Sequence, residues 1–240
     1  MSLDKQELMQ TVEGFSGDNT ATDHPDRTYF LHLKYDKCKM NPNQVTGIVL
    51  AGGRSSRMGE DKSLMMLNGK TMVEYAIDAL KPFCNRVIVS SNQLVYDFTG
   101  CQVWQDEGEN QAPIVGIYSS LKQSNTEFNF ILSCDMPLIG NKLIDYLLEC
   151  SLDFEITVPI HDNMMIEPLC GVYKKSVTGI LKQSIDEHQL SLKECINKTI
   201  HRFVEIDKQL TFFAPNLFKN INTPTDFEDI SLYLSGENLS

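Results

Sequence analysis

The sequence lacks the features of several large classes of protein. Its seven cysteines are scattered and include no C-x-x-C pair, so neither a zinc site nor a disulfide framework is indicated. No apolar run approaches the length of a membrane span, and no basic segment near the start leads into an apolar core. We therefore expect a soluble, cytoplasmic protein with no membrane partner.

An excess of positive charge is also missing. The formal net charge is -11 and the pI is near 4.9, which argues against nucleic acid as a partner, because a phosphate-binding surface must be positive where it makes contact. Any anionic ligand must therefore be small and bound locally. The 240 residues, 42% of them hydrophobic, suffice for one sizeable α/β domain with an appendage.

The appendage is expected at the start of the chain. Residues 1–44 are rich in turn formers such as Gly14, Gly17 and Pro25 and poor in core formers. Within them, residues 29–35 alternate apolar and polar side chains, which is compatible with one edge strand, although an extension without chemistry is the favoured interpretation. We predict an N-terminal extension of unknown role over 1–44, the main domain over 45–235 and a tail over 236–240.

From Val45 onward, apolar strands alternate with helical segments. This pattern predicts an α/β fold, a Rossmann-like three-layer α/β/α arrangement with a mostly parallel sheet. The predicted strands cover residues 48–50, 86–91, 101–105, 128–133, 156–160, 168–173 and 203–206. The predicted helices cover residues 72–83, 114–123, 141–150, 176–187, 192–196 and a last segment that Thr223 caps. In that last helix Phe227, Ile230 and Leu234 are expected to face the core.

Polar residues follow several predicted strands. Ser91-Asn92, Asp106 and Cys134-Asp135 each come after such a strand. Because open parallel sheets bind ligands beyond the carboxyl ends of their strands, we expect the functional site at that edge.

A glycine loop follows the first strand. Gly52 and Gly53 come directly after Leu50-Ala51, and Arg54, Arg57 and Lys62 supply cations downstream. Backbone N–H groups and cations converging in this way bind an anion, and a triphosphate needs about this much positive charge. A turn with a solvated basic face is the alternative interpretation.

Two familiar phosphate motifs are excluded. The dinucleotide fingerprint fails because the glycine after Gly53 comes only at Gly59. Gly69-Lys70-Thr71 is similar to the end of a P-loop, but Leu64 stands where its first glycine belongs. The glycine loop is therefore longer than these two motifs and different from both.

The loop carries a family resemblance. The run Leu50-Ala51-Gly52-Gly53-x-Ser55-x-Arg57-Met58-Gly59-x-Asp61-Lys62 resembles the signature loop of the sugar-nucleotidyltransferase-like superfamily, and most closely that of molybdenum cofactor guanylyltransferases. Further matches follow in the family's order at Ser91-Asn92, Asp106, Pro113-Ile114-Val115-Gly116, Cys134-Asp135-Met136-Pro137 and Asn220-Ile221-Asn222-Thr223-Pro224. The resemblance covers residues 45–235.

The resemblance implies nucleotidyl transfer. The terminal phosphate of molybdopterin would attack the α-phosphate of GTP with the help of Mg²⁺, releasing pyrophosphate and giving the guanine dinucleotide form of the molybdenum cofactor. Partners implied are GTP and molybdopterin, with molybdoenzymes or other cofactor-biosynthesis proteins as further candidates. The Gly52-Gly53 pair resembles the guanylyl branch, because cytidylyl relatives tend to carry alanine first.

The resemblance also implies roles for single residues. The implied catalytic residues are Lys62, Arg57 and Asp135. The implied nucleotide-binding residues are Leu50, Ala51, Gly52, Gly53, Lys62, Asn92 and Asp106. Asp135 and Asp106 are the implied metal ligands, since hard carboxylates suit Mg²⁺, and Asn220 and Asn222 are implied near the acceptor. Turn or capping roles for these aspartates and asparagines, and a surface salt bridge for Arg57, are the alternatives.

Two departures from the family pattern leave the acceptor open. Ala112 stands where the family usually has glycine, and Glu167 stands where it often has histidine or glutamine. A carboxylate near an anionic acceptor is unfavourable unless it binds metal or turns outward. The alternatives are therefore a transferase that uses CTP or another phosphorylated acceptor, and a nucleotide-binding module without turnover, although Lys62 and Asp135 count against the module.

Overall fold

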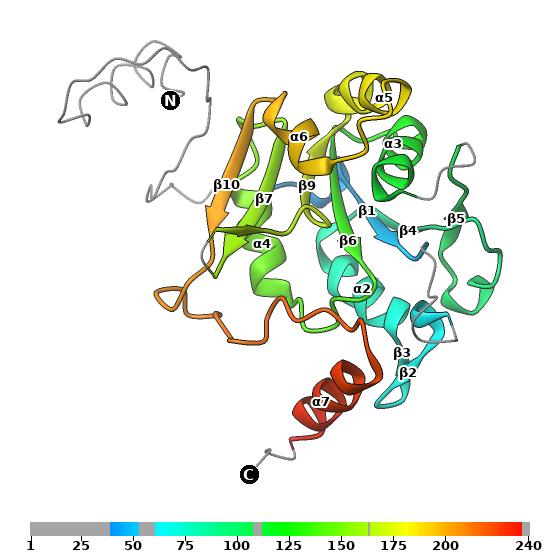
Figure 1. The fold of residues 1–240 in the computed structure, drawn as a ribbon, viewed down its shortest axis with the longest axis vertical. Coiled ribbons are helices and arrows are strands. Elements are labelled where there is room, and N and C mark those ends of the chain that lie inside the picture. Colours follow the sequence, from blue (N-terminus) through cyan, green and yellow to red (C-terminus); the bar gives the residue numbers. More distant parts are fainter. Residues whose placement is uncertain (1–38, 53–60, 108–111, 163, 237–240) are drawn as a thin grey trace.

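A mostly parallel sheet forms the middle layer of the protein (Figure 1). The computed structural model describes residues 39–52, 61–107, 112–162 and 164–236. The edge strand considered at residues 29–35, and the loop residues Gly53 and Arg57, lie outside these ranges.

The main sheet has eight strands within the described ranges, in the order β10-β7-β9-β6-β1-β4-β5, with β8 paired to β7. Their bounds are β1 (Val45–Leu50), β4 (Arg86–Ser90), β5 (Gln102–Trp104), β6 (Phe128–Ser133), β7 (Ile156–His161), β8 (Met165–Ile166), β9 (Cys170–Lys174) and β10 (His201–Glu205). β1 is parallel to β4 and β6, β4 to β5, and β7 to β10. β9 is antiparallel to both β6 and β7. The prediction of a mostly parallel sheet is confirmed.

Helices cover both faces of the sheet. The bounds are α2 (Met72–Leu80), α3 (Pro113–Gln123), α4 (Asn141–Glu149), α5 (Thr178–Asp186), α6 (Leu192–Asn197) and α7 (Pro224–Ser235). Short 3-10 turns lie at Pro42–Gln44, Lys62–Leu64, Lys81–Phe83, Asp97–Thr99 and Lys175–Val177. α2 and α4 pack into one core cluster, and α3, α5 and α6 into another on the opposite face. The three-layer prediction is therefore confirmed. Among the described helices, none combines the length and apolar character that a bilayer crossing requires.

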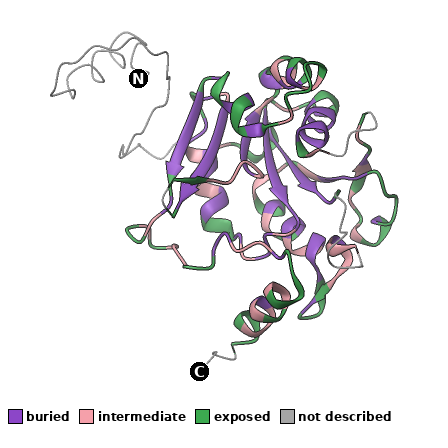
Figure 2. Ribbon diagram, in the orientation of Figure 1, coloured by how far each residue is buried: buried purple, intermediate pink, exposed green. Residues whose placement is uncertain are grey.

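Strand β1 lies at the centre of both cores. Val45 and Val49 belong to the cluster with α2 and α4, whereas Ile48 and Leu50 belong to the cluster with α3. All six residues of β1 are buried (Figure 2). Burial on both faces explains why the strand is an unbroken apolar run instead of an alternating one.

A small hairpin directly precedes helix α2 in the sequence. β2 (Met66–Leu67) and β3 (Lys70–Thr71) are joined by Asn68 and Gly69, whose φ angles are 47° and 85°. Positive φ at both turn residues is typical of the tightest hairpin connection and explains the Asn-Gly pair. The predicted turn is confirmed.

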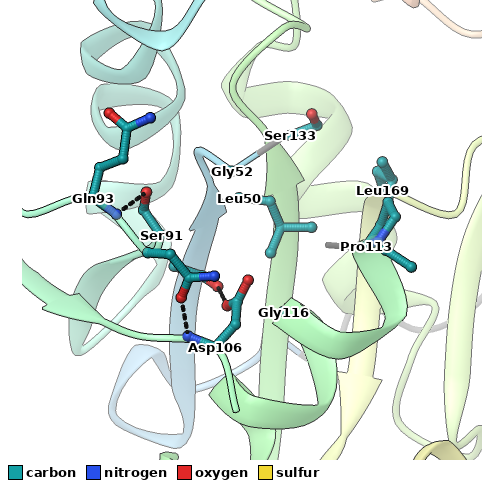
Figure 3. A pocket seen from close by; sticks show the side chains of 12 residues that line it. Leu50, Gly52, Ser91, Gln93, Asp106, Pro113, Gly116, Ser133 and Leu169 are labelled. Carbon is teal, nitrogen blue, oxygen red and sulfur yellow. Dashed lines mark hydrogen bonds between the residues drawn. The ribbon is translucent and has the colours of Figure 1, made fainter. Parts of the chain in front are cut away.

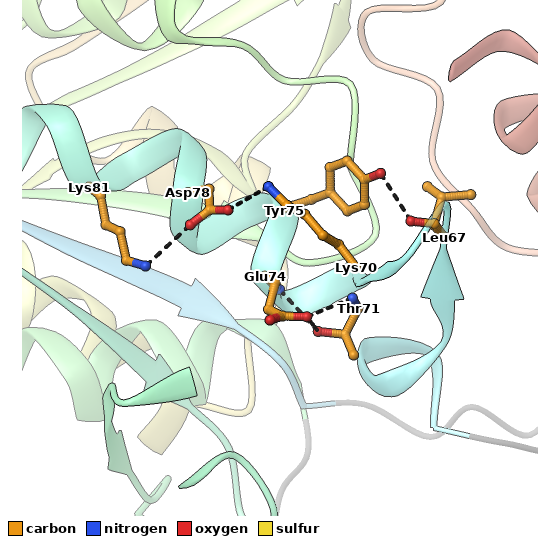
Figure 4. Close-up of polar contacts among 7 residues, drawn as sticks. All are labelled: Leu67, Lys70, Thr71, Glu74, Tyr75, Asp78 and Lys81. Carbon is orange, nitrogen blue, oxygen red and sulfur yellow. Dashed lines mark hydrogen bonds and ion pairs between the residues drawn. The ribbon is translucent and has the colours of Figure 1, made fainter. Parts of the chain in front are cut away.

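The hairpin is fastened to α2 by polar contacts (Figure 4). Thr71 caps the helix, and Glu74 accepts from the Thr71 backbone N–H and hydroxyl, which completes a capping box. The Tyr75 hydroxyl donates to the Leu67 carbonyl at 3.0 Å. These contacts fix the chain that immediately follows the glycine loop.

Four details differ from the sequence-based expectations. Helix α2 ends at Leu80 and continues as a 3-10 turn, because Pro82 lacks the N–H that an α-helical bond requires. β9 begins at Cys170, two residues later than predicted, and β10 begins earlier, at His201. Leu234 does not face the core: it is 37% exposed, while Ile230 of the same helix is 1% exposed.

Candidate active site

The candidate site lies at the carboxyl ends of the parallel strands. Strands β4 and β6 flank β1 on opposite sides and run in the same direction as β1. The chain connects β1 to one side first and to the other later, which creates the crevice where open α/β sheets bind ligands. Ala51, Ser91 and Asp135 follow these three strands, so the predicted site residues do lie at this edge of the sheet.

A cavity of about 150 Å³ opens at this edge (Figure 3). We call it the pocket. Its lining consists of Leu50, Gly52, Ser90, Ser91, Asn92, Gln93, Asp106, Ala112, Pro113, Gly116, Ser133 and Leu169. The structure thus brings Leu50, Gly52, Asn92 and Asp106 together, as predicted for a nucleotide site. Ala51 is buried beneath them, 5% exposed.

Asp106 is held by two neighbours at the ends of strands. The Ser90 hydroxyl donates to Asp106 Oδ1 at 2.9 Å, and the Asp106 backbone N–H donates to Asn92 Oδ1 at 2.9 Å (Figure 3). Burial raises the pKa of Asp106, while the bond from Ser90 acts in the opposite direction. The Asn92 oxygen is thus used within the protein, and its amide N–H₂ is the group that can donate to a ligand.

Gly116 allows helix α3 to approach the pocket closely. A Cβ at this position would lie 3.2 Å from Ser90 Oγ and 3.3 Å from Asp106 Oδ1. The missing side chain is therefore what leaves room for the Ser90–Asp106 pair.

Neither Gly52 nor Ala112, on the two sides of the pocket, has a backbone conformation that requires glycine. A Cβ at Gly52 would meet no described atom within 4 Å, and its φ lies outside the left-handed region. An open position with no packing reason for glycine fits close approach by a ligand. Ala112 has φ -72° and ψ 144°, angles that any residue adopts. Its departure from the family's glycine therefore carries no backbone penalty.

Lys62 is positioned by a capped turn. Asp61 Oδ1 accepts from the Ser63 backbone N–H at 3.0 Å and thereby caps the 3-10 turn that begins at Lys62. Lys62 Nζ donates to Asn222 Oδ1 at 3.0 Å, a contact across 160 residues of sequence. The lysine thus meets one of the two predicted acceptor asparagines.

Asp135 meets the same C-terminal segment. The Ile221 backbone N–H donates to the Asp135 carbonyl at 2.9 Å, and the Ile221 side chain is completely buried. Asn220 and Asn222 therefore lie on either side of the residue that contacts Asp135. We call Lys62, Asp135, Asn220 and Asn222 the lysine–aspartate cluster. Ser133, two residues before Asp135, lines the pocket, so the cluster and the pocket are neighbours.

Helix capping does not explain these side chains. Gly140 is the N-cap of α4, and Thr223 caps α7 with the help of Asp226. Neither Asp135 nor Asn222 is therefore the N-cap of these helices, although Asp135 does lie in a turn after β6, where the Met136 N–H donates to the Ser133 carbonyl.

The cluster contains oxygens that fit a hard cation. Asp135 Oδ1 and Asn220 Oδ1 are buried and have no hydrogen-bond partner among the described residues, an arrangement that costs free energy unless a ligand satisfies it. Carboxylate and carbonyl oxygens suit Mg²⁺, which binds one or two carboxylates together with substrate phosphates and water. Across the described ranges, no group of three or more His, Cys, Asp and Glu side chains could hold a metal, so phosphates would have to complete the shell.

The two predicted metal ligands are placed differently. Asp106 lines the pocket, whereas Asp135 belongs to the lysine–aspartate cluster and is absent from the pocket lining. The described contacts do not join their carboxylates.

Glu167 is paired with a histidine. His161 Nε2 lies 3.1 Å from Glu167 Oε1, and His161 Nδ1 lies 3.0 Å from Asp162 Oδ2. The imidazole is stacked on Phe218 with ring centroids 4.3 Å apart. Glu167 therefore does not turn outward, because it contacts a group that can donate to it and its side chain is 12% exposed. No local sequence pattern indicates this pair.

The cysteines near the site are poor nucleophiles. Burial strongly raises the pKa of Cys134, and the neighbouring Asp135 carboxylate raises it further. Burial likewise raises the pKa of Cys170, which pairs with Leu132 near the end of β6. These thiols stay protonated near neutral pH, so the site does not offer a thiolate for covalent catalysis.

The sequence analysis did not identify two residues that hold the ends of the glycine loop, Tyr96 and Ser63. Tyr96 is completely buried and contacts both ends of the glycine loop, and Ser63 joins it to Asp61. The Asp61-x-Ser63 spacing is a local turn signal that could have indicated the cap. No local pattern marks Tyr96.

The three-layer α/β fold and the family comparison define a nucleotidyltransferase. The family model for the MobA-like NTP transferase domain matches residues 47–202. A probable molybdenum cofactor guanylyltransferase of Flavobacterium johnsoniae is 30% identical over 80% of this chain and 98% of its own length. One from Clostridium perfringens is 33% identical over 76% and 93%. The chain belongs to the MobA-like NTP transferase family.

A solved structure extends the likeness. The molybdopterin-guanine dinucleotide biosynthesis protein A of Archaeoglobus fulgidus superposes with a TM-score of 0.69 at 22% identity, covering 80% of this chain and 99% of that one. At this identity the likeness concerns the fold. It agrees with the three-layer arrangement described above.

Proposed function

We propose that this protein transfers GMP from GTP to molybdopterin, giving the guanine dinucleotide form of the molybdenum cofactor. Relatives at 30% and 33% identity are named as probable molybdenum cofactor guanylyltransferases, which supports the guanylyl donor and the cofactor acceptor. The observation that carries the proposal is that the segment Asn220-Ile221-Asn222 contacts both Lys62 and Asp135, which lie far from it in the sequence.

The reaction needs positioning more than covalent chemistry. An oxygen of the acceptor's terminal phosphate bonds to the α-phosphorus of GTP, the bond from that phosphorus to the bridging oxygen breaks, and pyrophosphate leaves with this oxygen. A phosphate is already a nucleophile, so no enzyme-bound intermediate is required.

Each part of the site has a role in this step. The pocket would hold the guanosine, with the Asn92 N–H₂ group and the Asp106 carboxylate facing it. Lys62 would neutralise negative charge on the phosphates, and Asn222 would hold the lysine in place. Asp135 and Asn220 would hold a divalent cation, which we propose is Mg²⁺ and which supplies charge neutralisation when bound. Gly53 and Arg57 remain proposed nucleotide and phosphate contacts.

The acceptor proposal is supported by the state of Glu167. His161 Nε2 lies 3.1 Å from its Oε1, so this carboxylate has a hydrogen-bonding partner within the protein and is not left unpaired beside an anionic acceptor. The described cysteines are all free thiols, which supports a reducing compartment such as the cytoplasm for this reaction.

Pyrophosphate release tests the proposal. Purified protein with Mg²⁺, GTP and molybdenum cofactor should release pyrophosphate, and CTP should support less. Greater release with CTP would contradict the guanylyl assignment, and no release with any nucleotide would contradict the activity.

A thermal-shift panel separates the remaining alternatives. GTP with Mg²⁺ should raise the melting temperature more than CTP, UTP or ATP, since only a bound ligand stabilises the folded state. A GTP-specific shift without pyrophosphate release from any acceptor would favour a nucleotide-binding module instead.

A further inference from the structure

One buried hydroxyl group joins the two ends of the glycine loop. Tyr96 is 0% exposed, and its Oη lies 2.9 Å from the Ala51 carbonyl oxygen and 2.8 Å from Ser63 Oγ. Ala51 directly follows β1, and Ser63 directly follows Lys62. The tyrosine therefore fixes the distance between the end of the central strand and the turn that carries the lysine.

The contact continues to the cap of the lysine turn. The Ser63 hydroxyl donates to Asp61 Oδ1 at 2.7 Å, and the same oxygen accepts from the Ser63 backbone N–H. Ser63 is 1% exposed, so water does not compete for these bonds. Four groups thus form a continuous series of short oxygen–oxygen contacts, from Ala51 through Tyr96 and Ser63 to Asp61. Asp61 and Ser63 are the residues directly before and after Lys62.

This series of contacts contains fewer hydroxyl hydrogens than oxygen–oxygen contacts. The Ala51 carbonyl and the Asp61 carboxylate only accept, so the two hydroxyl hydrogens must serve three short oxygen–oxygen contacts. Burial raises the pKa of the Tyr96 hydroxyl, which keeps its hydrogen in place near neutral pH. Loss of the tyrosine hydroxyl leaves the Ala51 carbonyl with the longer bond from the Ser91 hydroxyl, at 3.4 Å, and removes the oxygen that contacts Ser63 Oγ.

We infer that Tyr96 is a positioning residue for nucleotide binding, which acts by holding Lys62 in reach of the phosphates. The inference rests on the proposed function, in which Lys62 meets those phosphates. Tyr96 itself is completely buried and absent from the pocket lining, so it touches no substrate and acts through the lysine turn.

The Tyr96→Phe variant tests this inference. It removes one oxygen and keeps the buried ring, so the core cluster to which Tyr96 belongs stays filled. We expect the dissociation constant for GTP with Mg²⁺, measured by titration calorimetry, to rise about tenfold, the effect of one displaced charged contact. Tyr75→Phe is the matched control, because its hydroxyl also donates to a backbone carbonyl, that of Leu67, away from the loop ends. It should leave GTP affinity unchanged.

A double-mutant cycle distinguishes positioning from general loosening. In the Lys62→Gln background, Tyr96→Phe should change GTP affinity less than twofold, because the group it positions is gone. A full tenfold loss in that background, or no loss in the wild-type background, would overturn the inference.

Two further measurements keep the test decisive. If Tyr96→Phe lowers the melting temperature enough to obscure binding, Ser63→Ala in the same cycle replaces it, with the same outcomes expected. If the wild-type protein binds no GTP, the proposed function fails. If it binds GTP and Tyr96→Phe binds equally well, only the inference about Tyr96 fails.

Discussion

The pocket and the lysine–aspartate cluster are assembled in different ways. The pocket takes its lining mainly from the ends of β1, β4 and β5 and from the start of α3, elements that the parallel ladder sets side by side. The cluster instead depends on a segment just before α7 that reaches Lys62 across 160 residues. In the proposed function, the nucleoside and its phosphates are thus bound by two parts of the site that are supported separately.

This difference predicts separable effects of mutation. Changes in the pocket should alter nucleotide affinity and leave the rate of the chemical step nearly unchanged. Changes in the cluster should lower the rate of turnover. A pair of variants that changed the same parameter to the same extent would break the comparison.

The largest effect is expected at Asp135. Asp135→Ala removes a buried oxygen that has no partner among the described residues, so the fold should persist while kcat falls about 100-fold or more. Steady-state pyrophosphate release and circular dichroism measure the two quantities. The exposed Asp153→Ala is the control and should behave as wild type. Unchanged kcat in Asp135→Ala would remove this residue from the metal site.

A smaller effect is expected at Gly116. The new Cβ of Gly116→Ala lies within 3.3 Å of Asp106 Oδ1, so the Ser90–Asp106 pair must shift, and GTP affinity should fall about tenfold with kcat nearly unchanged. Titration calorimetry and steady-state kinetics test this split. Gly179→Ala in helix α5 is the matched control, because a Cβ there meets nothing within 4 Å. It should keep full affinity and gain roughly 0.5 to 1 kcal/mol of stability, since alanine favours helices over glycine.

Glu167 lies outside both parts and should have a weaker effect. Glu167→Gln keeps an oxygen that can accept from His161 but removes the charge. We expect the KM for the molybdenum cofactor to change by roughly threefold, within the range of a single altered hydrogen bond, and GTP affinity to stay constant. Kinetics with each substrate varied in turn provide the measurement. A tenfold loss of GTP affinity would place this carboxylate in the nucleotide site.

The smallest effect concerns stability and pH. The pKa of Asp106 is raised in the folded protein, so the folded state holds its proton more tightly than the unfolded state. This carboxyl group therefore lowers stability as pH rises through the aspartate range, by the linkage between proton binding and folding. Asp106→Asn should be slightly more stable than wild type at neutral pH and lose that advantage on acidification. Urea unfolding at several pH values tests this, and a constant difference would contradict it.

The parallel half of the sheet could be predicted because its strands carry strong local signals. β1, β4 and β6 are short apolar runs followed by polar residues, and helix α7 starts at the predicted cap Thr223. These features depend on a few neighbouring residues. The pocket residues Asn92 and Asp106 could be placed for the same reason, since each directly follows such a strand.

The remaining features depend on contacts that the local sequence does not reveal. The antiparallel pairing of β9 with β7 is an exception. The described part of the link between these strands is short and contains no helix, and a link without a crossover helix joins antiparallel strands, so this pairing could have been predicted. The His161–Glu167 pair lies on opposite arms of that hairpin. The prediction that Leu234 faces the core is wrong. Helix α7 contributes Ile230 to a small hydrophobic cluster that also contains Leu67, and Leu234, one turn later, lies beyond that cluster.

The contact between Lys62 and Asn222 also constrains when the protein can become active during its synthesis. Chains grow from the N-terminus, and the parallel strands that form the pocket are complete long before the ribosome reaches Asn222. A nascent chain that has already folded these strands would still lack Asn222 beside Lys62 and Ile221 beside Asp135. The lysine–aspartate cluster is thus completed only after the pocket, by a short stretch that is made well after the strands.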